Sequence, residues 1–345
     1  MPRKVSHLAM RRFTTVLSVF ALLLGLAACG GRGDDKTLRI AYQAFPSGDL
    51  IVKNQHWLEQ ALPGYTIQWT KFDSGASINQ AFIGGALDIG AIGSSPVARG
   101  LSGATPIAYK VAFVLDVAGD NEALVARKAS GITSIAQLRG RTIATPFAST
   151  AHYSLLSALS QAGLTSADVK LVDLQPQAIL AAWDRGDIDA AYSWLPTLDE
   201  LRKTGTDLVT SRTIATDGRP TLDLSVVSDQ LIAQHPDVVA AWRKAQSRAL
   251  ALLNSDPTAA SRYIGPELNI SPDAALAQLR QGTYLSPAQV SSPDWLGSQG
   301  SPGRLANNLL SAAEFLVQQK QIDKAPTLRF LQGALYLQGL PGELQ

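Results

Sequence analysis

Hydrophobic and polar positions follow two alternating periods along the first third of the chain. Leu38, Ile40 and Tyr42 alternate with polar neighbours, as in a β-strand, and residues 49–62 carry apolar side chains at helical spacing. Further strands are predicted at 65–69, 87–92 and 107–115, and helices at 78–83 and from Pro96 onward. This alternation predicts a layered α/β fold with mostly parallel sheets.

The same alternation restarts after residue 115 and then gives way to helices. The second series consists of helices at 134–138, 151–162 and 178–185 and strands at 142–145, 169–173, 188–192 and 222–227. Three longer helices are predicted at 236–253, 272–280 and 304–319, with loops at Pro266, Pro287 and 291–303. The restart predicts a second lobe.

The N-terminus has the pattern of an export signal. Four basic residues precede an apolar run at 13–26, which is shorter than the roughly 20 residues of a transmembrane helix. The tetrapeptide Leu-Ala-Ala-Cys that ends at Cys29 matches the bacterial lipobox, in which the chain is cut before the cysteine and the thiol is acylated. The sequence therefore predicts a signal peptide over 1–28, a lipid-anchored tether over 29–37, and a periplasmic or cell-surface protein.

Composition narrows the class of the mature protein. Cys29 is the only cysteine of the chain, so no intramolecular disulfide or thiolate metal site can form. About 315 residues follow it, enough for two medium-sized domains, and 46% of the chain is hydrophobic. The four basic residues of the leader account for more than the net charge of +2, which leaves the mature chain weakly acidic. Nothing here is typical of a nucleic-acid-binding protein.

Three loops that follow predicted strands are rich in small and hydroxyl-bearing residues. They contain Ser74 and Gly75, Ser94 and Ser95, and Ser149 and Thr150. Ligands of α/β sheets bind beyond the carboxyl ends of the strands. Each loop is predicted to open a helix, whose first backbone N–H groups and dipole attract anions. Each serine alone is more often an ordinary helix cap, but three such loops on one edge make a shared anion site an equally good interpretation.

Patterns typical of enzymes are missing from the sequence. His152 could serve as a base, but no Gly-x-Ser-x-Gly elbow accompanies it. The histidines lack the spacing of a metal site, and no dinucleotide or P-loop glycine motif occurs.

Asp223 is a carboxylate within the predicted apolar strand 222–227. Because an unpaired buried charge is costly, Asp223 either pairs with an internal arginine, caps a backbone turn or neutralises the ammonium of a ligand. Trp194, at the end of a predicted strand, has a position that faces ligands, whereas Trp183 on a predicted helix fits a core or a pocket equally well.

Six segments resemble the taurine-binding proteins of ABC importers, within the wider family that binds sulfonates, nitrate and thiamine precursors. These segments are 71–78, 93–96, 121–125, 150–156, 181–189 and 220–223. The loop 43–49 departs from the pattern of the taurine-binding proteins.

The resemblance implies the type II periplasmic-binding-protein fold, in which two α/β lobes are joined by two crossover strands and close over a ligand cleft. The first lobe would comprise 38–121 and the helical 228–345, and the second lobe 122–227. The crossovers would lie near Asn121 and near 225–228.

The resemblance also implies a site for taurine, a zwitterion with a sulfonate and an ammonium. The three serine-rich loops would hold the sulfonate, with His152 nearby, and Asp223 would hold the ammonium, with Glu122 as a second candidate. Trp194 and either Tyr42 or Phe45 would cover the carbon linker, and Gln43 begins the loop that would line the pocket mouth.

The implied protein is a monomer without enzyme activity, cofactor or metal, which delivers taurine to an ABC permease and its ATPase for sulfur acquisition. Three other ligands are compatible with the same fold: an alkanesulfonate, nitrate or a pyrimidine-type thiamine precursor. Asp223 argues against nitrate. An enzyme on the same fold and a sensor module for a receptor are the alternatives of other classes.

Overall fold

Two mixed five-stranded sheets form the framework of the chain. The computed structural model describes residues 36–344, and both sheets belong to one unit that begins at Thr37. The predicted signal peptide, Cys29 and all but the end of the tether lie outside the described residues.

The first sheet has the strand order β2-β1-β3-β10-β4. Its strands are β1 (Thr37–Gln43), β2 (Thr66–Phe72), β3 (Ile89–Gly93), β4 (Tyr109–Val117) and β10 (Leu222–Ser228). β1 is parallel to β2 and β3, whereas β10 runs antiparallel to its neighbours β3 and β4. Helices α1 (Gly48–Asn54), α2 (Trp57–Ala61), α3 (Gly75–Ile83) and α4 (Ser94–Gly100) connect the first strands.

The second sheet has the order β7-β6-β8-β5-β9, with β5 antiparallel to both neighbours. Its strands are β5 (Glu122–Arg127), β6 (Thr142–Thr145), β7 (Lys170–Asp173), β8 (Ala190–Trp194) and β9 (Gly205–Thr210). Its helices are α5 (Thr150–Gln161), α6 (Pro176–Arg185), α7 (Thr197–Thr204) and α8 (Ser211–Thr216), with short 3₁₀ turns at Lys128–Ser130, Ile135–Leu138 and Ser166–Asp168.

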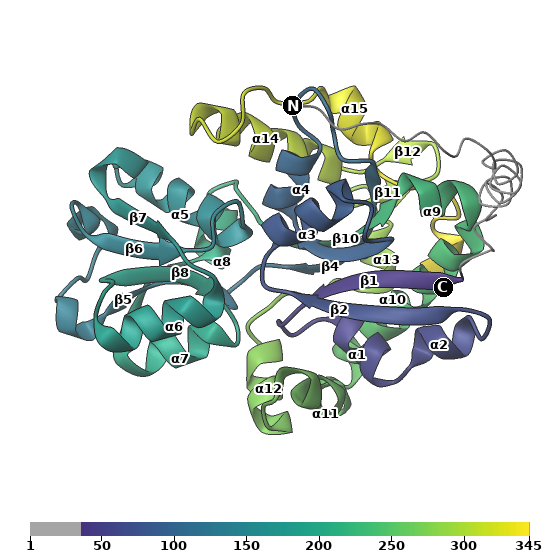
Figure 1. Ribbon diagram of the computed structural model, residues 1–345, viewed down its shortest axis with the longest axis horizontal. Helices are drawn as coiled ribbons and strands as arrows, with labels where there is room; N and C mark the ends of the chain where they lie inside the picture. Colours follow the sequence, from purple (N-terminus) through teal and green to yellow (C-terminus); the bar gives the residue numbers. More distant parts are fainter. Residues whose placement is uncertain (1–35, 345) are drawn as a thin grey trace, which may run out of the picture. The chain divides into compact units, whose positions relative to one another are not determined.

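Successive side chains of β5 point to opposite faces of the second sheet and are apolar on both faces. Helices cover both faces of this sheet (Figure 1). Leu124 and Ala126 belong to one apolar cluster, shared with α5, while Ala123 and Val125 belong to another, shared with α6 and α7.

The chain after β10 is mainly helical and packs on the first sheet. Its helices are α9 (Asp229–Gln234), α10 (Pro236–Ser255), α11 (Pro257–Leu268), α12 (Pro272–Leu279), α13 (Pro287–Val290), α14 (Leu305–Gln318) and α15 (Leu328–Gly333). A two-residue ribbon, β11 (Gly297–Ser298) with β12 (Ser301–Pro302), and a last 3₁₀ turn at Gly342–Leu344 complete it. No helix of residues 36–344 has the length and apolar character needed to cross a bilayer.

The predicted α/β fold with two lobes is confirmed, and the exceptions are local. The helix expected over 49–62 is broken into α1 and α2 at His56, which adopts a left-handed conformation. The prediction of a loop at Pro266 is wrong, because this proline lies in the last turn of α11. The helix ends at Asn269, so the missing N–H of Pro266 disturbs few of its hydrogen bonds. Residues 225–228, expected to cross between lobes, lie in β10 of the first sheet, so the second crossing precedes Leu222.

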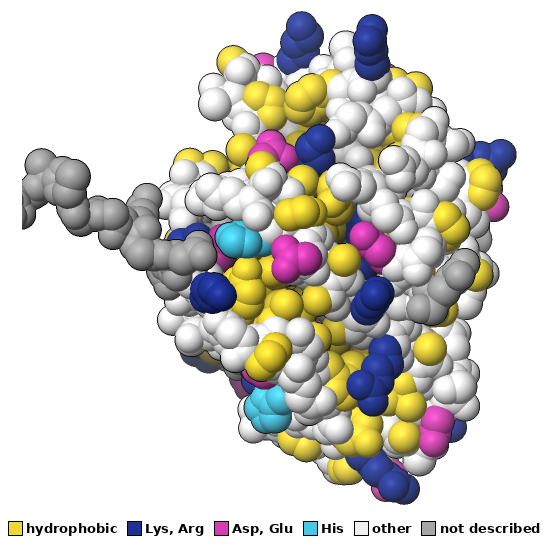
Figure 2. All heavy atoms as spheres, turned by 90° about the vertical axis from the view of Figure 1, so that its right-hand side faces the viewer, with side chains coloured by type: hydrophobic (Ala, Val, Ile, Leu, Met, Phe, Trp, Pro, Cys, Tyr) yellow, Lys and Arg dark blue, Asp and Glu magenta, His cyan; other side chains and the backbone are white. Residues whose placement is uncertain are grey.

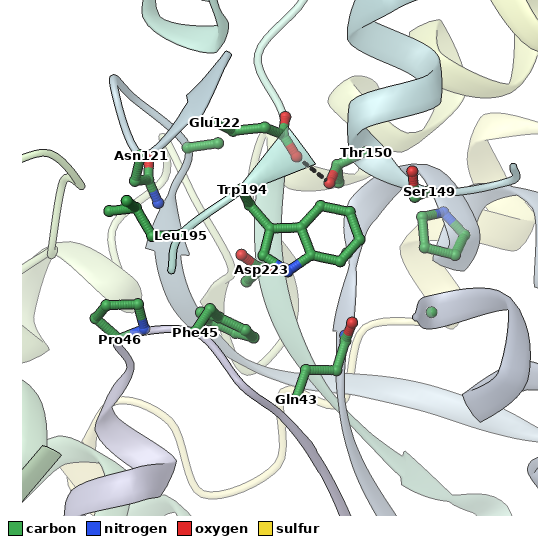
Figure 3. A pocket seen from close by; sticks show the side chains of 14 residues that line it. Gln43, Phe45, Pro46, Asn121, Glu122, Ser149, Thr150, Trp194, Leu195 and Asp223 are labelled. Atoms are coloured by element: carbon green, nitrogen blue, oxygen red, sulfur yellow. Dashed lines mark hydrogen bonds between the residues drawn. The ribbon is translucent and has the colours of Figure 1, made fainter. Parts of the chain in front are cut away.

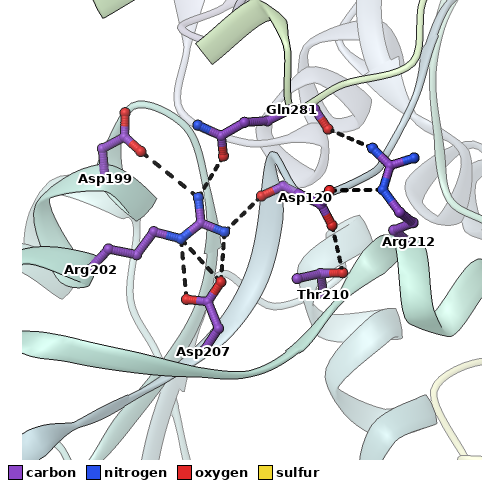
Figure 4. A network of polar contacts seen from close by, with 7 residues as sticks. All are labelled: Asp120, Asp199, Arg202, Asp207, Thr210, Arg212 and Gln281. Atoms are coloured by element: carbon purple, nitrogen blue, oxygen red, sulfur yellow. Dashed lines mark hydrogen bonds and ion pairs between the residues drawn. The ribbon is translucent and has the colours of Figure 1, made fainter. Parts of the chain in front are cut away.

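A polar network surrounds the first crossing between the sheets, at Asp120 (Figure 4). Arg202 of α7 donates to the Gln281 side chain at 2.6 Å and to the Asp120 carbonyl at 2.8 Å. Arg212 donates to the Asp120 carboxylate at 2.8 Å and to the Gln281 carbonyl at 3.2 Å. Because Gln281 follows α12, these contacts join the C-terminal helices to the second sheet's helices.

The buried Arg243 of α10 holds the C-terminal tail against the core. It is fully buried, donates to the carbonyls of Ala112, Gln338 and Tyr336, and forms an ion pair with Glu343 at 2.9 Å.

We expect Arg243→Met to lower the free energy of unfolding by about 3 kcal/mol, because three buried carbonyls and a carboxylate lose their donor. Urea unfolding of this variant and of Lys244→Met, at an exposed position of the same helix, measures the effect. Equal stability of the two variants would contradict this role for Arg243.

Candidate functional site

A pocket lies where the carboxyl ends of strands from both sheets meet (Figure 3). It is lined by Gln43, Phe45, Pro46, Gly75, Gly93, Pro96, Ala118, Asn121, Glu122, Ser149, Thr150, Trp194, Leu195 and Asp223. The lining residues come from the ends of β1, β3 and β8, the starts of α3 and α5, the first crossing and the start of β10. This is the edge at which α/β sheets bind ligands.

The structure brings most of the predicted site residues together. Those that line the pocket are Gln43, Gly75, Glu122, Ser149, Thr150, Trp194 and Asp223, whereas Ser74, Ser94, Ser95 and His152 are buried outside the lining. Asn121 and Leu195 line it without having been predicted, and Pro46 belongs to the loop 43–49 that was expected at the pocket mouth. They sit beside the crossing and after strand ends, a position that carries no distinctive residue pattern in the sequence.

Most of the predicted hydroxyl donors already form hydrogen bonds within the protein. The Ser149 hydroxyl accepts from the backbone N–H of His152 at 3.1 Å and donates to the Pro146 carbonyl at 2.6 Å. The Ser94 hydroxyl accepts from the backbone N–H of Leu222 at 3.1 Å. The cap interpretation therefore describes Ser149, whereas the Ser94 hydroxyl joins the start of α4 to β10. The anion donors left at the pocket are backbone N–H groups in the first turns of α3 and α5.

Glycines bring these helix starts close together. A Cβ at Gly75 would lie 2.5 Å from Pro96, and one at Gly93 would lie 2.5 Å from the Thr150 methyl group. Neither position accepts a side chain without displacement of the helix start beside it.

His152 is a neutral, buried side chain. Burial, assisted by the charge of Arg99, lowers its pKa to about 4. Its Nδ1 accepts from the backbone N–H of Ala148 at 3.2 Å, and its ring stacks on Phe147 at a centroid distance of 4.6 Å. These contacts suit a structural role at the start of α5.

Aromatic and apolar side chains form the pocket walls. Phe45 and Pro46 form one wall, while Tyr42 packs edge-on against Trp69 away from the lining. The indole N–H of Trp194 has no hydrogen-bond partner among residues 36–344, so it is available to a ligand. Trp183, in contrast, lies in the core and donates to Thr204 at 2.9 Å.

Glu122 is surrounded by hydroxyl groups. It accepts from Thr150 at 2.5 Å and from Ser211 at 2.6 Å, with two longer contacts at 3.4 Å from Ser154 and Thr221. Burial raises its pKa, and these donors act in the opposite direction. Because a carboxylate has about four lone-pair sites, the protein itself saturates Glu122.

Asp223 has no comparable set of donors. It lies directly opposite Asp116 in the β10–β4 ladder, and burial, followed by the charges of Asp116 and Glu122, raises the pKa of Asp223 well above its usual range. None of Asp49, Asp116, Glu122 and Asp223 forms an ion pair with a basic side chain within residues 36–344. The pairing of Asp223 with an arginine, one of the alternatives left by the sequence, is therefore not found in the described chain.

Asp116 and Asp49 are the carboxylates of this cluster that were not predicted from the sequence. Asp116 follows directly on the predicted apolar strand 107–115, whereas Asp223 was singled out because it lies within a predicted apolar strand. Metal-ligand clusters of three or more His, Cys, Asp or Glu side chains do not occur among residues 36–344.

We expect Ser149→Ala to lower the free energy of unfolding by about 1 kcal/mol, because α5 loses its side-chain cap. The matched control is Ser160→Ala, at an exposed position near the other end of the same helix, which should leave stability nearly unchanged. Chemical unfolding of both variants measures the two free energies of unfolding. A free energy of unfolding for Ser149→Ala equal to that of the unaltered protein would rule out a stabilising cap by the Ser149 side chain.

Two named proteins of Escherichia coli are similar to this chain in sequence. The chain is 36% identical, over 87% of its length and 92% of the relative's, to a protein of Escherichia coli named taurine-binding periplasmic protein. A second relative from the same organism, named putative aliphatic sulfonates-binding protein, is 27% identical over 79% of this chain and 90% of its own length.

The fold comparison agrees with the sequence comparisons. The crystal structure of the alkanesulfonate-binding protein of Xanthomonas axonopodis pv. citri superposes with a TM-score of 0.70 at 21% identity, covering 88% of this chain and 99% of that one. Residues 85–260 match the family described as NMT1/THI5 like. The protein therefore belongs to the NMT1/THI5-like family, together with the taurine-binding periplasmic protein.

Proposed function

We propose that this protein is the substrate-binding component of an ABC importer and that it captures taurine, 2-aminoethanesulfonate. One observation carries the choice of ligand. The pocket combines helix N-termini, which attract an anion, with a half-buried carboxylate, Asp223, that has no cationic partner in the described chain. A small zwitterion with a sulfonate at one end and an ammonium at the other satisfies both.

The two ends of taurine fit different parts of the pocket. The sulfonate is held by backbone N–H groups at the starts of α3 and α5, beside Gly75 and Thr150. The ammonium is held by Asp223, since Glu122 already accepts four hydroxyl groups. Trp194 and Phe45 cover the carbon linker. The relative named taurine-binding periplasmic protein supports this assignment.

Contacts to both sheets explain how binding is communicated. Gly75 belongs to the first sheet's helices and Thr150 to the second's, so a ligand that touches both stabilises the closed arrangement of the lobes. The permease would recognise this closed form and receive taurine from it.

An alkanesulfonate is the second candidate ligand, favoured by the relative named putative aliphatic sulfonates-binding protein. Such a ligand uses the helix N-termini but leaves Asp223 without a counter-charge. Nitrate has the same deficiency, and a thiamine precursor offers no sulfonate for the helix starts.

We also propose that the protein is not an enzyme, although its fold alone does not decide this. The lining contains no Cys, His or Lys side chain that could act as a nucleophile or base, and Glu122 is held by hydroxyls on all sides. The family relatives are named as binding proteins, which supports the same conclusion.

The proposed surroundings follow from this role. The chain is exported, anchored to a bacterial membrane through Cys29, and acts as a monomer with an ABC permease and its ATPase. Nucleic acid is not proposed as a partner: on the face in Figure 2, basic side chains are interspersed with acidic and apolar ones rather than gathered in a stripe.

Calorimetric titration of the purified protein with taurine and with ethanesulfonate tests the proposal. We expect taurine to bind more tightly, and Asp223→Asn to weaken taurine binding by about 2–5 kcal/mol while changing ethanesulfonate binding far less, because only taurine loses a counter-charge in a dry site.

Asp217→Asn, at an exposed position on the turn before β10, is the matched control and should bind both ligands like the unaltered protein. A preference for ethanesulfonate, or equal losses for both ligands in Asp223→Asn, would reassign the protein to general sulfonates.

A further inference from the structure

Asp116 and Asp223 form an unusual pair beneath the pocket. They are register partners on the antiparallel strands β4 and β10, so their backbones lie directly opposite each other. Asp116 is completely buried, and neither of its carboxylate oxygens has a hydrogen-bond partner among residues 36–344. Asp223 lies beside it and lines the pocket.

Every ionisable group that acts on this pair is acidic. Glu122 of β5 and Asp49 of α1 add negative charge to both carboxyls. Tyr284, in the segment after α12, is half-buried near them, and its hydroxyl donates to the Pro46 carbonyl at 2.9 Å. No lysine, arginine or histidine pairs with either aspartate in the described chain.

Two ionised carboxylates cannot remain side by side in such a site at low cost, because they repel each other, Asp116 is fully buried and Asp223 is half-buried. An ionised carboxylate is also an acceptor only, so a hydrogen bond between the two requires a proton. Burial raises the pKa of Asp116 to about 7, and that of Asp223 is raised well above its ordinary value. Both shifts favour the retention of a proton in the empty site.

We propose that Asp116 and Asp223 share one proton in the ligand-free protein and that the ammonium of the bound ligand takes the place of this proton. The inference deepens the proposed function and rests on it. On binding, the proton leaves for solvent, the ammonium stays protonated, and both carboxylates are ionised. No covalent bond to carbon, nitrogen or sulfur changes. Asp116 is a positioning residue, which acts on the ligand through Asp223.

The exchange makes binding depend on pH in a defined direction. The empty site binds one more proton than the occupied site, so affinity for taurine rises with pH, by about tenfold per pH unit while the pair is protonated, and levels off above its pKa. A sulfonate without an ammonium cannot displace the proton, and its affinity lacks this rise. The pair thus distinguishes taurine from sulfonates without an ammonium in two ways: by the release of a proton and by direct contact with the ammonium.

Titration calorimetry in two buffers with different ionisation enthalpies at the same neutral pH counts the released protons. We expect about one proton released per taurine bound by the unaltered protein and none for ethanesulfonate. Equal apparent enthalpies in the two buffers, with taurine still bound, would overturn the shared proton and leave the proposed function standing. Absence of taurine binding would overturn both.

Asp116→Asn tests the part played by Asp116, since the amide keeps the shape of the side chain and can donate to an ionised Asp223. We expect taurine to bind with less proton release at neutral pH, and the rise of affinity with pH to move to lower pH. Unchanged release would assign the proton to Asp223 alone and overturn the pairing. Asp217→Asn should release as many protons as the unaltered protein. The count on the unaltered protein decides the main claim even if Asp116→Asn fails to fold.

Discussion

The arrangement of the pocket depends on a buried group of carboxylates that the protein does not neutralise by itself. Asp49, Asp116, Glu122 and Asp223 lie close enough to influence one another's ionisation, and basic side chains of the described chain pair with none of them. Hydroxyl groups solvate Glu122, and Ser47 donates to Asp49. Asp116 and Asp223 receive no such support, so a proton or a cation has to balance them.

The fold explains why this charge lies at the pocket. β4 and β10, which carry the two aspartates, are neighbours in the first sheet, and the chain passes to and from the second sheet close to the ends of these strands. The anion-attracting helix starts come from both sheets and meet at the same edge. In the proposed binding mode, the cation of the ligand lies at the crossings and its anion contacts both lobes. The Arg202 network reinforces the first crossing beside the site.

Hydrophobic patterns in the sequence predicted most of the α/β elements, because β1 alternates between buried and half-buried positions and because β3, β6 and α5 are runs of mainly buried residues. β5 and β9 were not predicted, because β5 has only four apolar residues between two charged ones and β9 has only two apolar side chains, Leu208 and Val209. For the site, glycines and serines after strands pointed to the edge at which the pocket lies. The sequence could not tell that the Ser94 hydroxyl accepts from the backbone N–H of Leu222, or that Asp116 faces Asp223, because both depend on which distant segments become neighbours.

A crystal structure of the protein with taurine would show whether an unneutralised carboxylate at the crossings selects an ammonium. We expect the taurine nitrogen to lie within hydrogen-bond distance of the Asp223 carboxylate. The sulfonate oxygens should accept from the backbone N–H groups at the starts of α3 and α5. A ligand bound in the reverse orientation, or with its nitrogen held by other groups while Asp223 stays out of contact, would contradict it.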